Sequence, residues 1–95
     1  MIQLPRYNTI QIIELLEHQY YMSEKVGYEM PIQITSNDWY FNHAANFSKR
    51  YVEHNEAINN YCDSVCGVNK CQGFKACSLN EEKGLDKIIH KLLED

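Results

Sequence analysis

All four cysteines of the chain lie between Cys62 and Cys77, in the stretch CDSVCGVNKCQGFKAC. The whole chain has 95 residues, and a chain of that length makes one domain with an apolar core only just large enough for stability. A centre that joins the four thiols would therefore contribute strongly to the fold. We expect a single domain, residues 1–95, in which the cysteine segment, residues 62–77, brings these thiols together.

Charge and hydropathy disfavour several functional classes for this chain. The 9 basic and 13 acidic residues give a net charge of -4, which disfavours broad binding to nucleic acid or to anionic lipid. In residues 1–21 charged residues interrupt the apolar ones, so the uninterrupted apolar run of a signal peptide or a membrane span is missing. We therefore expect a cytoplasmic protein with no membrane association, where reducing conditions disfavour structural disulfides.

Three helical patterns predict an all-α fold with three main helices. The first helix is expected over about residues 9–26, between the capping residue Asn8 and Gly27, which suits a left-handed cap. The second is expected over residues 36–66, because the residues of a heptad-like seam, apolar except at His54, recur there at alternating steps of four and three. They are Tyr40, Ala44, Phe47, Tyr51, His54, Ile58, Tyr61 and Val65. A helix of that length is long for so small a domain, so a break at His54–Asn55 is an open alternative.

The third helix is expected over residues 79–94, after the capping residue Ser78. Its apolar residues follow helical spacing: Leu85, Ile88, Ile89 and Leu92. Gly84 weakens the first turn of this helix. The cysteine segment then forms the hairpin turn between the second and third helices.

The positions of the cysteines suit a metal centre. Cys62 and Cys66 are four residues apart and share one face of a helix. Cys71 follows in a glycine-containing loop, and Cys77 lies beside a helix start, where the helix dipole is expected to lower the pKa of its thiol. Because clustered cysteines in a reducing compartment commonly bind metal, we predict that Cys62, Cys66, Cys71 and Cys77 are metal ligands.

The spacing leaves the cofactor open between an iron–sulfur cluster, such as 4Fe–4S, and zinc. The Cys-x₂-Cys pairs common in zinc sites are absent, whereas all-cysteine iron–sulfur clusters tolerate varied spacing. One alternative is a thiol-redox switch that forms a reversible Cys66–Cys77 or Cys62–Cys71 disulfide. Another is a metal-free interaction subunit in which the thiols are simply buried.

The remaining polar and aromatic residues give no catalytic motif, so the sequence favours a non-enzymatic module. His54 is assigned to the apolar face of the second helix rather than to a metal, and no spacing connects His18, His43 or His90 with the cysteines. Adjacent residues on a helix point in different directions, so Trp39, Tyr40 and Phe41 cannot all be buried, and this region predicts a protein partner. We expect an accessory, regulatory or electron-carrying subunit of a larger protein.

Overall fold

The computed structural model describes residues 2–93, and every regular element in this part of the chain is helical. The α-helices are α1 (Leu4–Val26), α2 (Ile32–Asn42), α3 (Ala44–Glu53), α4 (Asn55–Cys66) and α5 (Leu85–Leu93). Two short 3₁₀ helices, η1 (Phe74–Ala76) and η2 (Ser78–Glu81), lie between α4 and α5. The all-α prediction is confirmed, but the described chain has five α-helices rather than three main helices.

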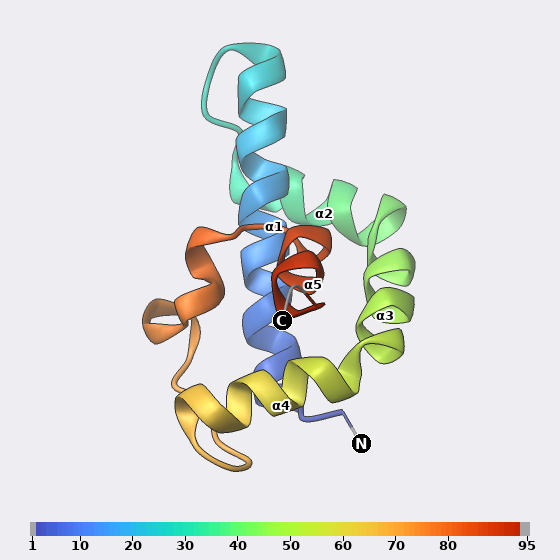
Figure 1. Cartoon of the computed structure of the whole chain (residues 1–95). Helices are drawn as coiled ribbons and strands as arrows, with labels where there is room; N and C mark the ends of the chain where they lie inside the picture. The colour runs from blue at the N-terminus through green and yellow to red at the C-terminus, as the bar shows by residue number, and fades with distance from the viewer. Residues whose placement is uncertain (1, 94–95) are drawn as a thin grey trace.

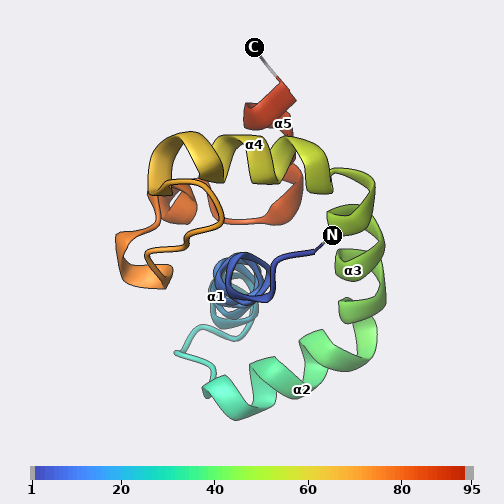
Figure 2. The same cartoon turned by 90° about the horizontal axis from the view of Figure 1, so that it is seen from below.

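Helix α1 runs through the centre of the domain. In the view along its axis, α2, α3 and α4 follow three sides around it, and the segment after α4 lies on the fourth side (Figure 2). The C-terminal part of α1 extends beyond the other helices (Figure 1). Burial agrees with this arrangement, because the buried residues of α1 all lie in its N-terminal half, from Arg6 to Ile13. Tyr20 and Tyr21, farther along, are exposed.

The start of α1 differs from the sequence prediction, whereas its end agrees with it. The helix begins at Leu4 rather than near residue 9, and Pro5 in its first turn explains the earlier start, because that turn needs no backbone donor. The end is as predicted. Gly27 adopts a left-handed conformation with φ of 80°, and its N–H donates to the carbonyl of Ser23 at 2.9 Å.

The helix predicted over residues 36–66 is divided by two single-residue junctions. His43, with φ of -130°, separates α2 from α3, and His54, with φ of -114°, separates α3 from α4. The break near His54–Asn55 was the alternative that the length of the helix suggests, whereas nothing in the apolar pattern indicates the break at His43. One straight helix could not follow three sides of α1, so the junctions allow α2, α3 and α4 to wrap around it.

The C-terminal helix is shorter than the predicted range of residues 79–94. Its first part is the 3₁₀ helix η2, and Gly84, with φ of 102°, separates η2 from α5. The backbone angle at Gly84 favours glycine, and a side chain there would also displace the carboxylate of Glu17. Helix α5 ends at Leu93, and residue 94 lies outside the described residues.

The core forms where the N-terminal half of α1 meets the other helices. Its fully or nearly buried members are Ile10, Ile13, Trp39, Phe47, Tyr51, Ile58, Cys62, Leu79, Leu85, Ile88 and Ile89. The apolar residues predicted for the last helix are among them, with Leu92 packed against the cluster. None of the described helices combines the length and the apolar character needed to cross a membrane.

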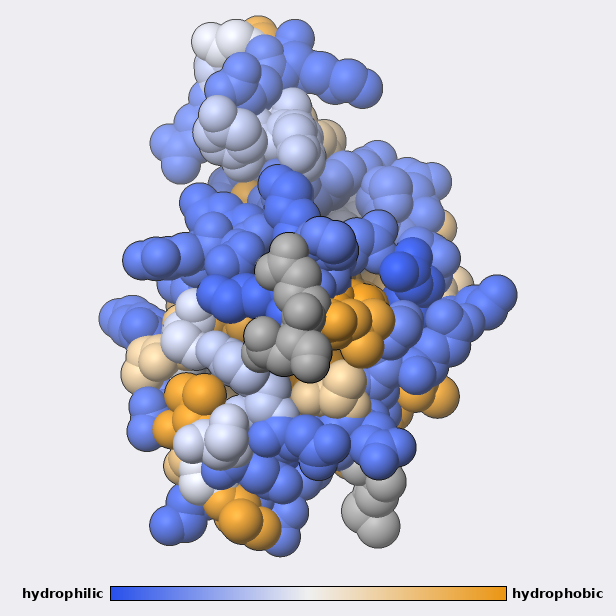
Figure 3. Space-filling model, viewed as in Figure 1, coloured by the Kyte–Doolittle hydropathy of each residue, from blue (hydrophilic) through white to orange (hydrophobic). Residues whose placement is uncertain are grey.

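The aromatic triplet of α2 divides between core and surface. Trp39 is 2% exposed, whereas Tyr40 and Phe41 are 68% and 80% exposed, which confirms that the three cannot share one buried face. Trp39 therefore belongs to the core. On the face shown in Figure 3, hydrophilic residues cover most of the surface and hydrophobic residues form separate patches.

Candidate functional site

The four cysteines come from three parts of the chain after the midpoint of α4. Cys62 and Cys66 lie in the last turns of α4, Cys71 lies in the following loop, and Cys77 lies between η1 and η2. The simple hairpin turn that the sequence predicts is not confirmed, because η1 and η2 lie between α4 and α5. All four cysteines are free, and Cys62 is the most buried, at 8% exposure.

These cysteines all line one small cavity beside the N-terminal half of α1, together with Thr9 and Ile10. The cavity has a volume of about 20 Å³, enough for roughly one water molecule. Among the described residues, no three cysteine sulfurs lie within 4.8 Å of one another. The fold therefore brings the four thiols to a common cavity without bringing three of them into mutual contact.

Arg6 of α1 connects the central helix to the cysteine segment. It is 1% exposed, and its guanidinium pairs with the carboxylate of Asp63 at 2.7 Å. It also donates to the backbone carbonyls of Asn59, Gly67 and Lys70, at distances of 3.1 to 3.2 Å. One buried side chain thus holds the end of α4 and the loop before Cys71, and places a positive charge beside the thiols.

The loop cysteine is also held by α1. The hydroxyl of Thr9 lies 3.3 Å from the sulfur of Cys71, within hydrogen-bonding distance. The thiol of Cys71 donates to the carbonyl of Pro5 at 3.6 Å. Because a hydroxyl can also donate to a thiolate, Thr9 can stabilise Cys71 in either protonation state.

Burial keeps two of the thiols protonated at neutral pH. It raises the pKa of Cys62 to about 11, against the opposing influence of Arg6. Burial also raises the pKa of Cys77, although hydrogen bonds from the backbone N–H groups of Leu79 and Asn80 act in the opposite direction. The prediction that the helix start lowers the pKa of Cys77 is therefore wrong in net direction. A metal must displace these protons in order to bind.

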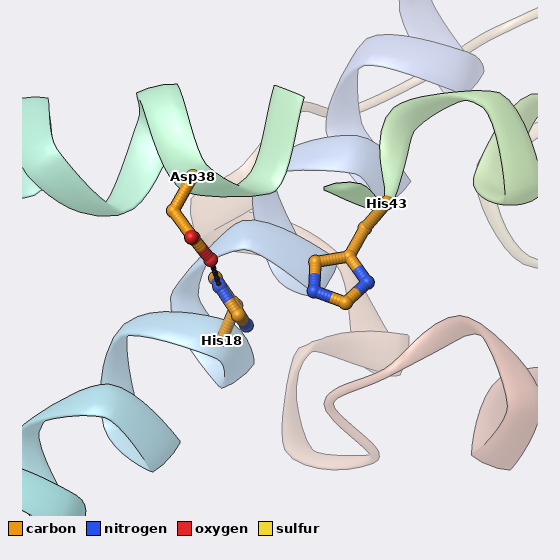
Figure 4. Close-up of side chains that lie close together, drawn as sticks. All are labelled: His18, Asp38 and His43. Carbon is orange, nitrogen blue, oxygen red and sulfur yellow. Dashed lines mark hydrogen bonds and ion pairs between the residues drawn. The ribbon is translucent and has the colours of Figure 1, made fainter. Parts of the chain in front are cut away.

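A second group of potential ligands is absent from the sequence prediction. His18 of α1, Asp38 of α2 and His43 at the α2–α3 junction place their ligand atoms within 4.8 Å of one another (Figure 4). His18 and His43 were assigned to no site, because no short spacing connects residues on different helices. For Arg6 a signal did exist, since it lies at helical spacing from the buried residues Ile10 and Ile13.

With this geometry established, comparison of the chain with protein-family models, with curated proteins and with solved structures finds no match in any of the three.

Proposed function

We propose that Cys62, Cys66, Cys71 and Cys77 bind one metal centre, an iron–sulfur cluster of the 4Fe–4S type. The observation that carries the proposal is that all four cysteines line a single cavity, although they come from a helix, a loop and a junction between two short helices. The chain then acts as a small accessory, regulatory or electron-carrying module in the cytoplasm, where reducing conditions keep the thiols available as ligands.

The separation of the sulfurs supports a cluster over a single zinc ion. Four thiolates around zinc, each about 2.3 Å from the ion, lie about 3.8 Å from one another. No three of the described cysteine sulfurs lie within 4.8 Å of one another, and a cubane cluster accepts wider separations because each thiolate binds a different iron. A cluster needs more space than the present cavity, so the cysteine segment would have to open on loading. Gly67 and Gly73, both at positive φ, flank the loop that contains Cys71.

The surroundings of the sulfurs suit an anionic centre. Arg6 and Lys70 line the cavity and supply positive charge. The hydroxyl of Thr9 and the backbone N–H groups that donate to Cys77 supply hydrogen bonds. Such donors stabilise thiolate ligands and adjust the reduction potential of a cluster. The raised pKa of Cys62 makes its thiolate harder to form both for thiol exchange and for metal binding.

Reconstitution with iron and sulfide in the absence of air tests the cluster directly. We expect a brown protein with broad visible absorbance and about four iron and four sulfide ions per chain. Replacing any one of Cys62, Cys66, Cys71 or Cys77 by serine should reduce the bound iron sharply, whereas the matched variant His54→Gln should retain it.

The other outcomes separate the alternatives. A colourless protein that binds one zinc per chain through the same four cysteines would replace the cluster with a zinc site. A protein without metal whose free-thiol count rises on reduction would support the redox switch. Full iron content in all four serine variants would contradict the ligand assignment.

Tyr40 and Phe41 are the proposed contact with the larger protein. Their rings stack edge to face with centroids 5.6 Å apart, and both are mostly exposed at the surface of α2. Exposed aromatic pairs of this kind are enriched at protein interfaces, where they bury a large area with little loss of side-chain entropy.

A photo-crosslinking amino acid at position 41 tests this contact in cells. We expect one discrete adduct, formed in amounts that fall when Tyr40 is replaced by serine, because the two rings act together. The same crosslinker at Val52, which is also exposed but lies on α3, serves as the control. Equal adducts from both positions, or none from position 41, would contradict a partner surface on α2.

A further inference from the structure

A second cavity, with a volume of about 310 Å³, lies between α1, α2 and α5 and is lined by none of the four cysteines. His18 and His43 line it, as do the carboxylate residues Glu14 and Glu17. Asp86 and Lys87 line it too, but Lys87 pairs with Glu17 at 3.5 Å and Asp86 pairs with Arg50 at 2.9 Å. A cation would therefore be held by ligand atoms rather than by the net charge of the cavity.

Two of the residues that line this cavity, His18 and His43, place ligand atoms within 4.8 Å of a carboxylate oxygen of Asp38, which lies beside the cavity. The Nε2 atom of His18 lies 2.7 Å from Oδ2 of Asp38, and the rings of His18 and His43 pack edge to face with centroids 4.7 Å apart. Figure 4 shows the three side chains converging from α1, α2 and the junction after α2. Ligands bound to one metal at about 2.0 to 2.2 Å are separated by about 3 Å, so only His43 has to move closer.

The surroundings of Asp38 and His43 would allow the ring of His43 to move closer to the other two ligands. The amide of Asn42 donates to Oδ1 of Asp38 at 3.0 Å and orients the carboxylate, as outer hydrogen bonds do in metal sites. His43 is exposed and forms the single-residue junction between two helices, so its ring can rotate without disturbing the core. One ligand is thus held in place, and another can adjust.

A buried donor at the same cavity also lacks a partner. Trp39 lines the cavity and is 2% exposed, and its Nε1–H has no hydrogen-bond acceptor among the described residues. A buried donor without an acceptor is costly in a folded protein. A water, hydroxide or other oxygen ligand on a bound metal would supply an acceptor for this group.

We propose that His18, Asp38 and His43 bind one divalent first-row transition metal ion, with Zn²⁺ and Fe²⁺ the ions best suited to the ligand set. Two imidazole nitrogens and one carboxylate oxygen form the three-ligand arrangement that leaves coordination positions open in catalytic zinc sites and in Fe(II) facial triads. His18 and His43 also line the cavity of about 310 Å³, which is large enough for a small molecule. This site is independent of the four-cysteine centre, because the two share no ligand.

Nuclear magnetic resonance of the imidazole rings tests the site with Zn²⁺ alone as the probe. Zinc added to the full chain should shift the ring nitrogen signals of His18 and His43 together, while those of His54 and His90 stay in place. Replacing His43 by glutamine should raise the dissociation constant of zinc, measured from the shift of His18, by about 100-fold, because it removes a direct ligand. The matched variant His90→Gln should leave it unchanged.

The ring signals distinguish this site from zinc bound at the cysteines, which would leave both rings unshifted. Because His43 is exposed, its glutamine variant is expected to keep the backbone amide spectrum of the folded chain. If that variant unfolds, the shifts of the unmodified chain decide the question alone. Excess zinc that leaves the rings of His18 and His43 unshifted, or equal affinity in His43→Gln, would overturn the proposal.

Discussion

Replacing Arg6 by alanine is expected to lower the free energy of unfolding by about 3 kcal/mol, a large share of the stability of a domain this small. The substitution removes a buried guanidinium and leaves the carboxylate of Asp63 without its ion-pair partner. It also removes the donor to the carbonyls of Asn59, Gly67 and Lys70. The value lies at the low end for a broken buried pair because Asp63 is partly exposed, with 33% side-chain accessibility.

Chemical denaturation of the two variants Arg6→Ala and Arg50→Ala measures this effect. Arg50 also forms an ion pair, 2.9 Å from Asp86, but at the surface, where such a pair contributes less than about 1 kcal/mol. We expect Arg6→Ala to shift the midpoint strongly and Arg50→Ala only slightly. Similar small shifts for both variants would show that Arg6 does not hold the cysteine segment to α1.

Removing the proposed metal centre under reducing conditions is expected to accelerate amide hydrogen exchange in the cysteine segment by about 100-fold. A centre that joins the four thiols closes a loop of about 15 residues, which the chain-entropy model values at about 3 kcal/mol. A free-energy change of about 1.4 kcal/mol alters the equilibrium constant of opening tenfold. Reducing conditions matter because a disulfide could otherwise replace the metal as a cross-link.

The acceleration should spread only to the elements that the segment contacts. The first turns of α1 should follow it, because Arg6 and Thr9 bond to residues of the segment. The part of α1 next to α2, where His18 pairs with Asp38, should keep its protection. Exchange followed by mass spectrometry resolves these regions. Equal acceleration in all helices would indicate one cooperative core, and unchanged exchange would indicate that the centre stabilises nothing.

The sequence predicts well those features that depend on neighbouring residues. The apolar spacing of Leu85, Ile88 and Ile89 predicts the buried face of α5 correctly, and Gly27 predicts the end of α1. The end of α4 at Cys66, just before Gly67, is also predicted. In each case the information lies within a few residues along the chain, where helix periodicity and glycine conformations act.

The junction at His43 could not be predicted in the same way, because the apolar spacing continues through it. It exists because α2 must turn to place Trp39 against Phe47, with ring centroids 5.5 Å apart, which buries Trp39 in place of Tyr40. Only the packing around α1 decides which of two adjacent aromatic residues faces inward. Here tertiary packing, rather than local helix periodicity, determines where the helix breaks.

The candidate sites also differ in whether neighbouring residues or the whole fold determine them. The four cysteines are close in sequence, so their grouping could be inferred from spacing. Arg6 and Asp63 are separated by 57 residues, and His18 and Asp38 by 20, so their pairing follows from the fold alone. A buried arginine also runs against the usual apolar pattern of a helix face.

X-ray absorption at the iron edge tests the central claim most directly, on the His43→Gln chain reconstituted without air, because this variant lacks a ligand of the second proposed site. Our account predicts sulfur neighbours alone in the first shell of iron, with iron neighbours beyond them, and the loss of both when Cys62→Ser is added. Nitrogen or oxygen neighbours in the first shell of the His43→Gln chain, or a spectrum that Cys62→Ser leaves unchanged, would contradict the assignment of the four cysteines as the ligands of an iron–sulfur cluster.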